Sequence, residues 1–232
     1  MNEKNNSEEF NNNESLTNKS NIDQTMDDNE KNNIKYIKSN QHKKTLKLVQ
    51  LAFLSALIIV LQLLVTIMPL QIKPSLVMIP IVLGGCLYGV KEGTILGAVF
   101  GLITFIAGVT GIDPSVNAIF IIHPYITFIF MMLKATAAGF VSSFIYSKVK
   151  NNKKSVRLAS ICAPSVNTLI FIIGMATIYR DILQEMAVNS GFANVLIFVL
   201  IGFVCCNYIF EVLTTAIITP LIFPKVKNAI SK

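Results

Sequence analysis

Charge is scarce in this sequence: only 14% of its 232 residues are Asp, Glu, Lys or Arg, whereas about a quarter of a soluble globular domain is charged. Tryptophan is absent, so any aromatic belt at a membrane surface must use tyrosine. The chain also lacks a Walker A loop, an HExxH helix, a G-x-S-x-G turn and a CxxC pair. These absences exclude ATP hydrolysis by the chain alone, and we predict no catalytic residue, cofactor or metal site.

Long apolar runs dominate what is present. Hydrophobic residues make up 53% of the chain, and a transmembrane helix needs about 20 of them in a row. The runs lie near residues 47–68, 75–90, 93–110, 125–147, 156–178 and 195–222. The second and third are short and are separated by Val90-Lys91-Glu92-Gly93, which favours a tight hairpin inside the bundle. We therefore predict an all-α integral membrane protein, with six transmembrane helices in residues 41–232.

Residues 1–40 have a different composition. They contain twelve Asn and eight of the thirteen acidic residues of the chain, with almost no aromatic side chains. Such a segment buries too little apolar area to offset the entropy of ordering, so we predict a disordered polar tail. It does not resemble a secretory signal, because the first apolar run begins only near Leu46 and is too long for one.

The positions of the basic residues predict the orientation. Residues 41–232 hold fifteen Lys or Arg against five Asp or Glu. The cations gather before the first helix, between the second and third, between the fourth and fifth, and after the sixth, at Lys43, Lys44, Lys47, Lys91, Lys148, Lys150, Lys153, Lys154, Arg157, Lys225, Lys227 and Lys232. The positive-inside rule then places both termini in the cytoplasm and the loops near 69–74, 111–124 and 179–194 outside. Because the cations lie in short loops between apolar runs, we predict no nucleic-acid binding.

Small residues recur at every fourth position in two places. Gly89, Gly93, Gly97 and Gly101 form the longer series. From Gly93 onward these glycines share one helix face and let another backbone approach closely, as packing between membrane helices requires. We predict a packing seam inside the subunit, with a seam against a partner protein as the alternative. The second place is Ala52-x-x-x-Ala56 on the first helix.

Polar side chains inside the predicted spans are the candidates for ligand contact. They are Lys134, Asn167, Thr168, Asn207 and Glu211. A lysine within the bilayer costs at least about 2.5 kcal/mol on insertion scales, so Lys134 should face a cavity or a partner acid. Two alternatives stay open at this point. Lys134 could snorkel to the outer surface. Glu211 could have a structural role, in which it hydrogen-bonds a hydroxyl or pairs with Lys134.

The stretch Ile79-Pro80-Ile81-Val82-Leu83-Gly84-Gly85-Cys86-Leu87-Tyr88-Gly89, with Lys91-Glu92-Gly93 after it, resembles the S components of energy-coupling factor (ECF) transporters. The likeness spans residues 45–225. Ala52 and Ala56 match the small-residue motif that these subunits place against their transmembrane coupling partner.

Further matches lean toward the pantothenate-type branch of this family. Lys134 stands where many members have Arg, and Asn167-Thr168 resembles a recurrent pair in the fifth helix. Asn207 with Glu211 resembles the Asn-x-x-x-Glu pattern of the sixth helix.

The resemblance implies a vitamin-binding subunit in the bacterial cell membrane. Such a subunit docks on a module of one transmembrane coupling protein and two ATPases, then topples to release its ligand inward. The ligand site is expected in the outer half of the bundle, between the fourth to sixth helices and the loops at 69–74 and 111–124. Pantothenate is one candidate ligand, and folate or riboflavin is an alternative.

Each candidate residue then has an expected role. Lys134 would attract a ligand carboxylate. Asn167 and Asn207 would hydrogen-bond amide or hydroxyl groups, and Glu211 would orient one of these or hold Lys134.

The sequence leaves two alternative functions from other classes. An intramembrane enzyme acting on a lipid or prenyl substrate could use Glu211 or His123 as a base, but the sequence shows no metal or nucleophile constellation beside them. An oligomeric scaffold could use the glycine seam without any ligand. Turnover of a lipid by the protein alone would favour the enzyme, and failure of the folded protein to bind any vitamin would favour the scaffold.

Overall fold

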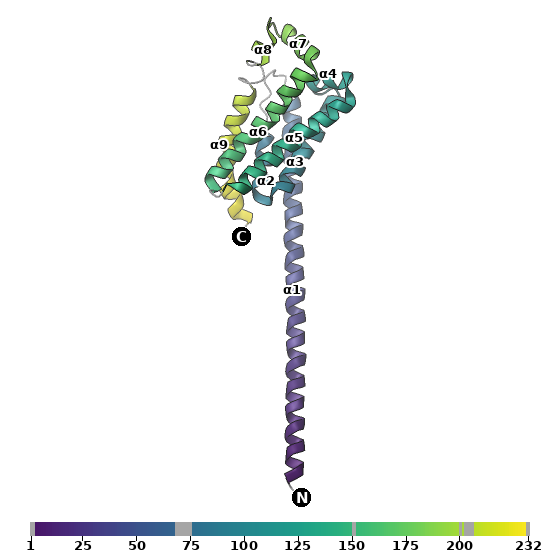
Figure 1. Cartoon of the computed structure of the whole chain (residues 1–232), viewed down its shortest axis with the longest axis vertical. Helices are drawn as coiled ribbons and strands as arrows, with labels where there is room; N and C mark the ends of the chain where they lie inside the picture. Colours follow the sequence, from purple (N-terminus) through teal and green to yellow (C-terminus); the bar gives the residue numbers. More distant parts are fainter. Residues whose placement is uncertain (1–2, 68–75, 150–151, 200, 202–206, 231–232) are drawn as a thin grey trace. The chain divides into compact units, whose positions relative to one another are not determined.

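The structure is a computed structural model that describes residues 3–67, 76–149, 152–199, 201 and 207–230. Within these ranges the main regular elements are α-helices (Figure 1). They are α1 (Glu3–Ile67), α2 (Met78–Tyr88), α3 (Val90–Val109), α4 (Pro114–Ile122), α5 (Pro124–Lys148), α6 (Asn152–Thr177), α7 (Arg180–Asn189), α8 (Val195–Phe198) and α9 (Ile209–Ile230).

The chain divides into two compact units, Met1–Val49 and Gln50–Lys232. The first unit belongs to α1, which is helical from Glu3, whereas the sequence predicts a disordered tail over residues 1–40. Side chains at 32–39 are exposed, so this part of the helix is stabilised by its own backbone hydrogen bonds and not by side-chain packing. Because isolated helices are marginal in water, disorder of the tail in solution stays a prediction.

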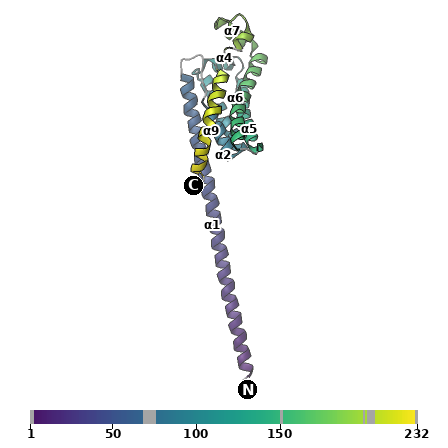
Figure 2. The same cartoon turned by 90° about the vertical axis from the view of Figure 1, so that its left-hand side faces the viewer.

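The second unit is a bundle of apolar helices. Five helical segments of the described chain are long and apolar enough to cross a membrane, at 32–66, 90–109, 124–148, 153–177 and 209–230. Figure 1 shows α5 between α3 and α6, with α9 beside α6. Helices α4 and α7 lie at the end of the bundle away from the C-terminus in both views (Figures 1 and 2). The chain is therefore a multi-pass membrane protein, as its composition predicts.

Helix α2 differs from the predicted span at 75–90. It has 11 residues, which at 1.5 Å per residue is about 16 Å, roughly half of the 30 Å hydrocarbon core. Eight of its residues are buried. The helices packed against α2 are α3, α5, α6 and α9, so protein and not lipid surrounds most of this short helix.

Two loops predicted to face outward contain helices. The 111–124 segment holds α4, and the 179–194 segment holds α7. The start of α4 is encoded locally, because the Asp113 carboxylate accepts hydrogen bonds from Ser115 N and Val116 N at 3.1 and 3.4 Å. Pro114 then occupies the first helical position, which suits its fixed φ and missing N–H.

The turn between α2 and α3 is a single glycine. Gly89 has φ 115° and ψ −179°, and its N–H donates to the Gly85 carbonyl, a backbone conformation that is essentially restricted to glycine. Lys91 and Glu92 consequently lie in the first turn of α3, not in the connection where the sequence predicts them. Gly89 is thus a turn residue, which separates it from the glycines that follow.

The α3 glycines lie against α5 of the same chain. A Cβ on Gly97 would overlap the Ala135 carbonyl, and one on Gly101 would lie 2.8 Å from the Met131 carbonyl oxygen. A Cβ on Gly93 would lie 3.0 Å from the Gly139 carbonyl oxygen. The backbones come this close because α3 has glycines at the crossing, and close approach of this kind is how membrane helices gain packing energy.

We expect Gly97→Ala to lower the unfolding temperature of the purified protein, because its new methyl group meets rigid backbone of α5. Overpacking of this kind typically costs about 1 to 3 kcal/mol. Gly84→Ala is the matched control, since the Cβ there meets the ends of the Leu96 and Leu54 side chains, which can rotate away. Thermal unfolding in detergent compares the two, and equal stability of both variants would contradict the seam.

Two apolar clusters fill the bundle, one on each side of Lys134 along α5. The α2 cluster includes Ile81, Leu96 and Ala138. The α4 cluster includes Ile119, Phe130 and Tyr179. Lys134 is therefore a charged group between two apolar layers.

Candidate functional site

Lys134 is the centre of the candidate site. Its side chain is 8% exposed, and its Nζ lies 4.9 Å from the centre of the Phe171 ring on α6. Two acidic side chains of the bundle, Glu211 and Asp113, are buried to a similar degree, at 6% and 8% exposure. The burial of Lys134 and its position over an aromatic face disfavour a lysine that snorkels to the surface.

Glu211 brings α9 to the site. It lies in the first turn of α9 and is 6% exposed. Thr215 and Thr219 follow it at four-residue intervals and are fully buried, so the face of α9 that is turned into the bundle is polar for three turns. Asn207 lies just before α9 and is partly buried. Nearby, the Tyr208 and Ser165 hydroxyls are 2.9 Å apart and link α9 to α6.

Asn167 and Thr168 lie on α6 and are partly buried. Asn167 is one turn before Phe171, so both face the same side of the helix. The Asn167 Oδ1 is buried and has no hydrogen-bond partner among the described residues. Buried polar atoms are normally paired, so this carbonyl oxygen is suited to accept a hydrogen bond from a ligand N–H or O–H.

An aromatic wall stands next to Lys134. The Phe130 and Phe171 rings stack with centroids 6.1 Å apart, and Phe130 also packs against Tyr179 at 6.0 Å. Gly174 lets the Phe130 ring approach α6, because a Cβ there would overlap the ring. The wall is rigid and apolar, which is the usual lining of a small-molecule site.

Hydrogen bonds fix this wall to α4. Thr127 Oγ1 donates to the Ile119 carbonyl at 2.9 Å, and it lies 2.8 Å from the Tyr179 hydroxyl. Because the single Thr127 hydroxyl proton goes to Ile119, Tyr179 is the donor in the second bond. The hydrogen bonds from Tyr179 to Thr127 and from Thr127 to Ile119 thereby join the turn before α7 to α5 and α4.

Sequence reasoning missed part of this arrangement. Phe130 and Phe171 lie within predicted spans, where an aromatic residue does not mark a site. Tyr179 lies at the end of a predicted span and Asp113 in a predicted loop. The Asp-Pro pair at 113–114 was an available signal for a helix start. The aromatic wall had no comparable signal, because its rings come from α5, from α6 and from the turn before α7. The loop at 69–74, which the sequence predicts as another wall of the ligand site, lies outside the described residues.

Ala52 and Ala56 are separate from the Lys134 site. Both are exposed on α1, beside the exposed Phe53. Ile58 and Gln62 are buried on the same helix, and at 100° per residue they point to the other side of it. The two alanines therefore lie on a face of α1 that this bundle leaves uncovered.

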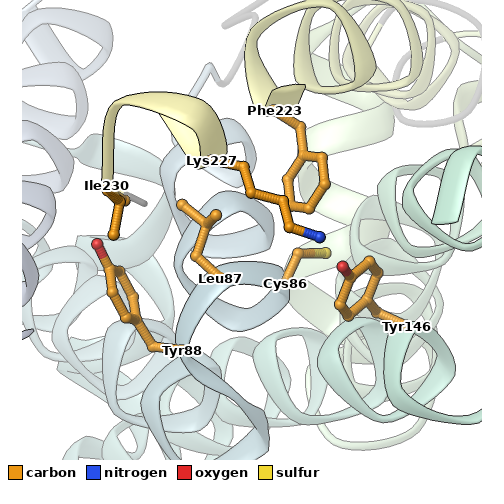
Figure 3. A pocket seen from close by; sticks show the side chains of 7 residues that line it. All are labelled: Cys86, Leu87, Tyr88, Tyr146, Phe223, Lys227 and Ile230. Carbon is orange, nitrogen blue, oxygen red and sulfur yellow. The ribbon is translucent and has the colours of Figure 1, made fainter. Parts of the chain in front are cut away.

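A cavity of about 300 Å³ lies elsewhere, at the opposite end of α5 and α9 (Figure 3). Its lining residues are Cys86, Leu87, Tyr88, Tyr146, Phe223, Lys227 and Ile230. Tyr146 follows Lys134 on α5 by a rise of about 18 Å at 1.5 Å per residue. The cavity is thus distinct from the candidate site at Lys134.

Comparison with known proteins places the chain among transporters. The family model described as "Thiamine transporter protein (Thia_YuaJ)" matches residues 48–174, a range that includes Lys134 and Asn167 but ends before α9. The pantothenic acid transporter PanT of Lactococcus lactis subsp. cremoris is 25% identical over 195 residues, which cover 77% of this chain and 92% of that protein. No solved structure matches.

Proposed function

The chain belongs to the thiamine transporter protein family, which confirms the resemblance to S components seen in the sequence, and we propose that it binds a carboxylate-bearing vitamin for uptake. It is a transporter subunit and not an enzyme. Pantothenate is the first candidate ligand, because the Lactococcus relative is named for pantothenic acid.

The buried Lys134 is the observation that carries this proposal. Removing an ammonium from water is costly unless an anion compensates for it, and a ligand carboxylate could supply that compensation next to Phe171. Pantothenate has one carboxylate together with amide and hydroxyl groups. The free Asn167 carbonyl oxygen offers an acceptor for one of these donors, and Glu211 would orient Lys134 or a ligand hydroxyl.

The family description names thiamine, whose thiazolium ring is a cation. A cation is disfavoured next to the Lys134 ammonium, whereas the buried Glu211 carboxylate on α9 would attract one. Asp113 already accepts two backbone hydrogen bonds at the start of α4, which leaves it less available to a ligand. Lys134 and Glu211 together carry no net charge, so the preference for an anionic vitamin rests on Lys134 as the partner of a carboxylate and on the relative that is named for pantothenic acid.

We expect the detergent-purified protein to retain pantothenate, detected by mass spectrometry of the released small molecules. In calorimetric titrations, pantothenate should bind at least about tenfold more tightly than thiamine, a difference of about 1.4 kcal/mol. Folate and riboflavin serve as further comparisons. Preferential retention of thiamine would contradict the charge argument, and turnover of a lipid by the protein alone would support the enzyme alternative.

The remaining parts of the proposal concern topology and partners. The basic loops support cytoplasmic termini, a cytoplasmic tail at residues 1–40, and six crossings of a bacterial plasma membrane with α2 in the second. The uncovered Ala52 and Ala56 face supports docking on a transmembrane coupling protein, as in S components. Two partner ATPases would then supply the energy that the chain cannot obtain itself.

A further inference from the structure

The cavity at the far end of α5 from Lys134 has a composition that suits a second ligand. Its volume of about 300 Å³ is at the lower limit of the range for small-molecule sites, about 300 to 1,000 Å³. The last turns of α2, α5 and α9 supply its walls. Nothing in the proposed vitamin uptake requires this cavity, so the inference stands independently of that proposal.

One corner of the cavity is polar. Figure 3 shows the Lys227 amine, the Tyr146 hydroxyl and the Cys86 thiol pointing into the same corner. The Phe223 ring holds this corner together, because Lys227 Nζ and the Tyr146 ring centre each lie 5.7 Å from its centre. Lys227 is the charged residue among the described residues that line the cavity. The corner can therefore donate hydrogen bonds to an anion from an ammonium, a hydroxyl and a thiol.

The other side of the cavity is apolar. Leu87 and Ile230 line it, together with the ring of Tyr88 (Figure 3). The Tyr88 hydroxyl donates to Gln50 Oε1 at 2.8 Å, which fixes the ring against α1. A water-soluble anion would not use this wall, whereas an anion attached to a hydrocarbon chain would bury its first methylenes there.

The cavity also lies where membrane spans end. Tyr88 is the last residue of α2, Tyr146 is two residues before the end of α5, and Ile230 is the last residue of α9. Tyrosine and lysine at the ends of spans lie at the depth of the lipid headgroups. Basic pockets between transmembrane helices at this depth bind phospholipid headgroups.

We propose that this cavity binds one anionic phospholipid. The Lys227 amine and the Tyr146 hydroxyl donate to the phosphate, and the glycerol and upper acyl chain lie against Leu87 and Ile230. The lipid would join the ends of α2, α5 and α9.

The test uses the full-length protein in mild detergent, titrated with phosphatidylglycerol or phosphatidylcholine and observed by native mass spectrometry. Lys227→Gln should weaken phosphatidylglycerol binding at least about tenfold, because it removes a charge-assisted hydrogen bond to the phosphate. The matched control is Lys225→Gln, which removes an equal charge from α9 outside the cavity, and it should weaken binding less than about fivefold, the effect of diffuse attraction at a membrane surface. Tyr146→Phe keeps the ring and loses the phosphate donor, so it should also weaken binding.

Several results would overturn the proposal. Equal weakening by Lys227→Gln and Lys225→Gln would show diffuse attraction to the basic surface. Equal binding of phosphatidylcholine and phosphatidylglycerol would exclude an anion site. If glycerol 1-phosphate competes at the same concentrations at which the lipid binds, the occupant is a soluble phosphate. If Lys227→Gln fails to fold, unchanged lipid binding by Tyr146→Phe would still exclude the proposed phosphate corner.

Discussion

Lys134→Gln should weaken pantothenate binding about 100-fold. The reason is that a buried ammonium which faces a ligand carboxylate forms a desolvated ion pair, and truncating one partner of such a pair costs about 2 to 5 kcal/mol. A 100-fold loss corresponds to about 2.7 kcal/mol, near the lower end of that range. Calorimetric titration of the purified protein measures it directly.

A second lysine on the same helix provides the control. Lys148 also lies over a phenylalanine ring, with its Nζ 5.4 Å from the centre of Phe144, but it is exposed at the end of α5. Lys148→Gln therefore removes the same charge and a similar ring contact without touching the site, and it should bind pantothenate normally. Full affinity in Lys134→Gln would show that the ligand carboxylate lies elsewhere.

Glu211→Gln separates ligand contact from internal pairing. If Lys134 serves only to neutralise Glu211, each single variant leaves one buried charge and lowers the unfolding temperature. The double variant Lys134→Gln with Glu211→Gln would then recover stability. If Lys134 binds the ligand, the double variant stays defective in binding even where its stability recovers. The reason is that the glutamine amide introduced at position 134 cannot form an ion pair with the ligand carboxylate.

The Ala52→Trp, Ala56→Trp double variant should lose vitamin uptake while keeping vitamin binding. Both alanines are exposed on α1, and a partner helix at van der Waals distance has no room for two indole rings. Overpacking costs about 1 to 3 kcal/mol for each substitution, so assembly should weaken about 30-fold or more. Uptake in cells that contain the coupling module and ligand retention by the isolated subunit are the two measurements.

Ala176→Trp is the matched control for these tryptophans. Ala176 is a small exposed residue within the α6 span, away from α1, so its replacement should leave uptake unchanged. Normal uptake by the α1 double variant would reject docking through these alanines. Loss of binding as well as uptake would mean that the alanines support the fold of the subunit itself.

Much of the architecture followed from local properties of the sequence. Scarce charge and long apolar runs identified a membrane helix bundle because a hydrocarbon core imposes length and polarity limits on each segment separately. The regular spacing of Gly93, Gly97 and Gly101 similarly marked a face where a second backbone comes close. The composition of residues 1–40 set that segment apart, although the structure continues α1 through it.

Other features depended on how the helices meet. The sequence could mark Lys134 and Glu211 as costly groups, but only the packing of α5 against α6, and of α6 against α9, placed the Phe171 ring 4.9 Å from the Lys134 amine and buried Glu211 in the bundle. The same packing made α2 a short buried helix and closed a cavity at the ends of α2, α5 and α9. Hydropathy and residue spacing describe one segment at a time. Burial, the partners of a side chain and the shape of a cavity depend on several segments together. The tertiary structure alone decided these features.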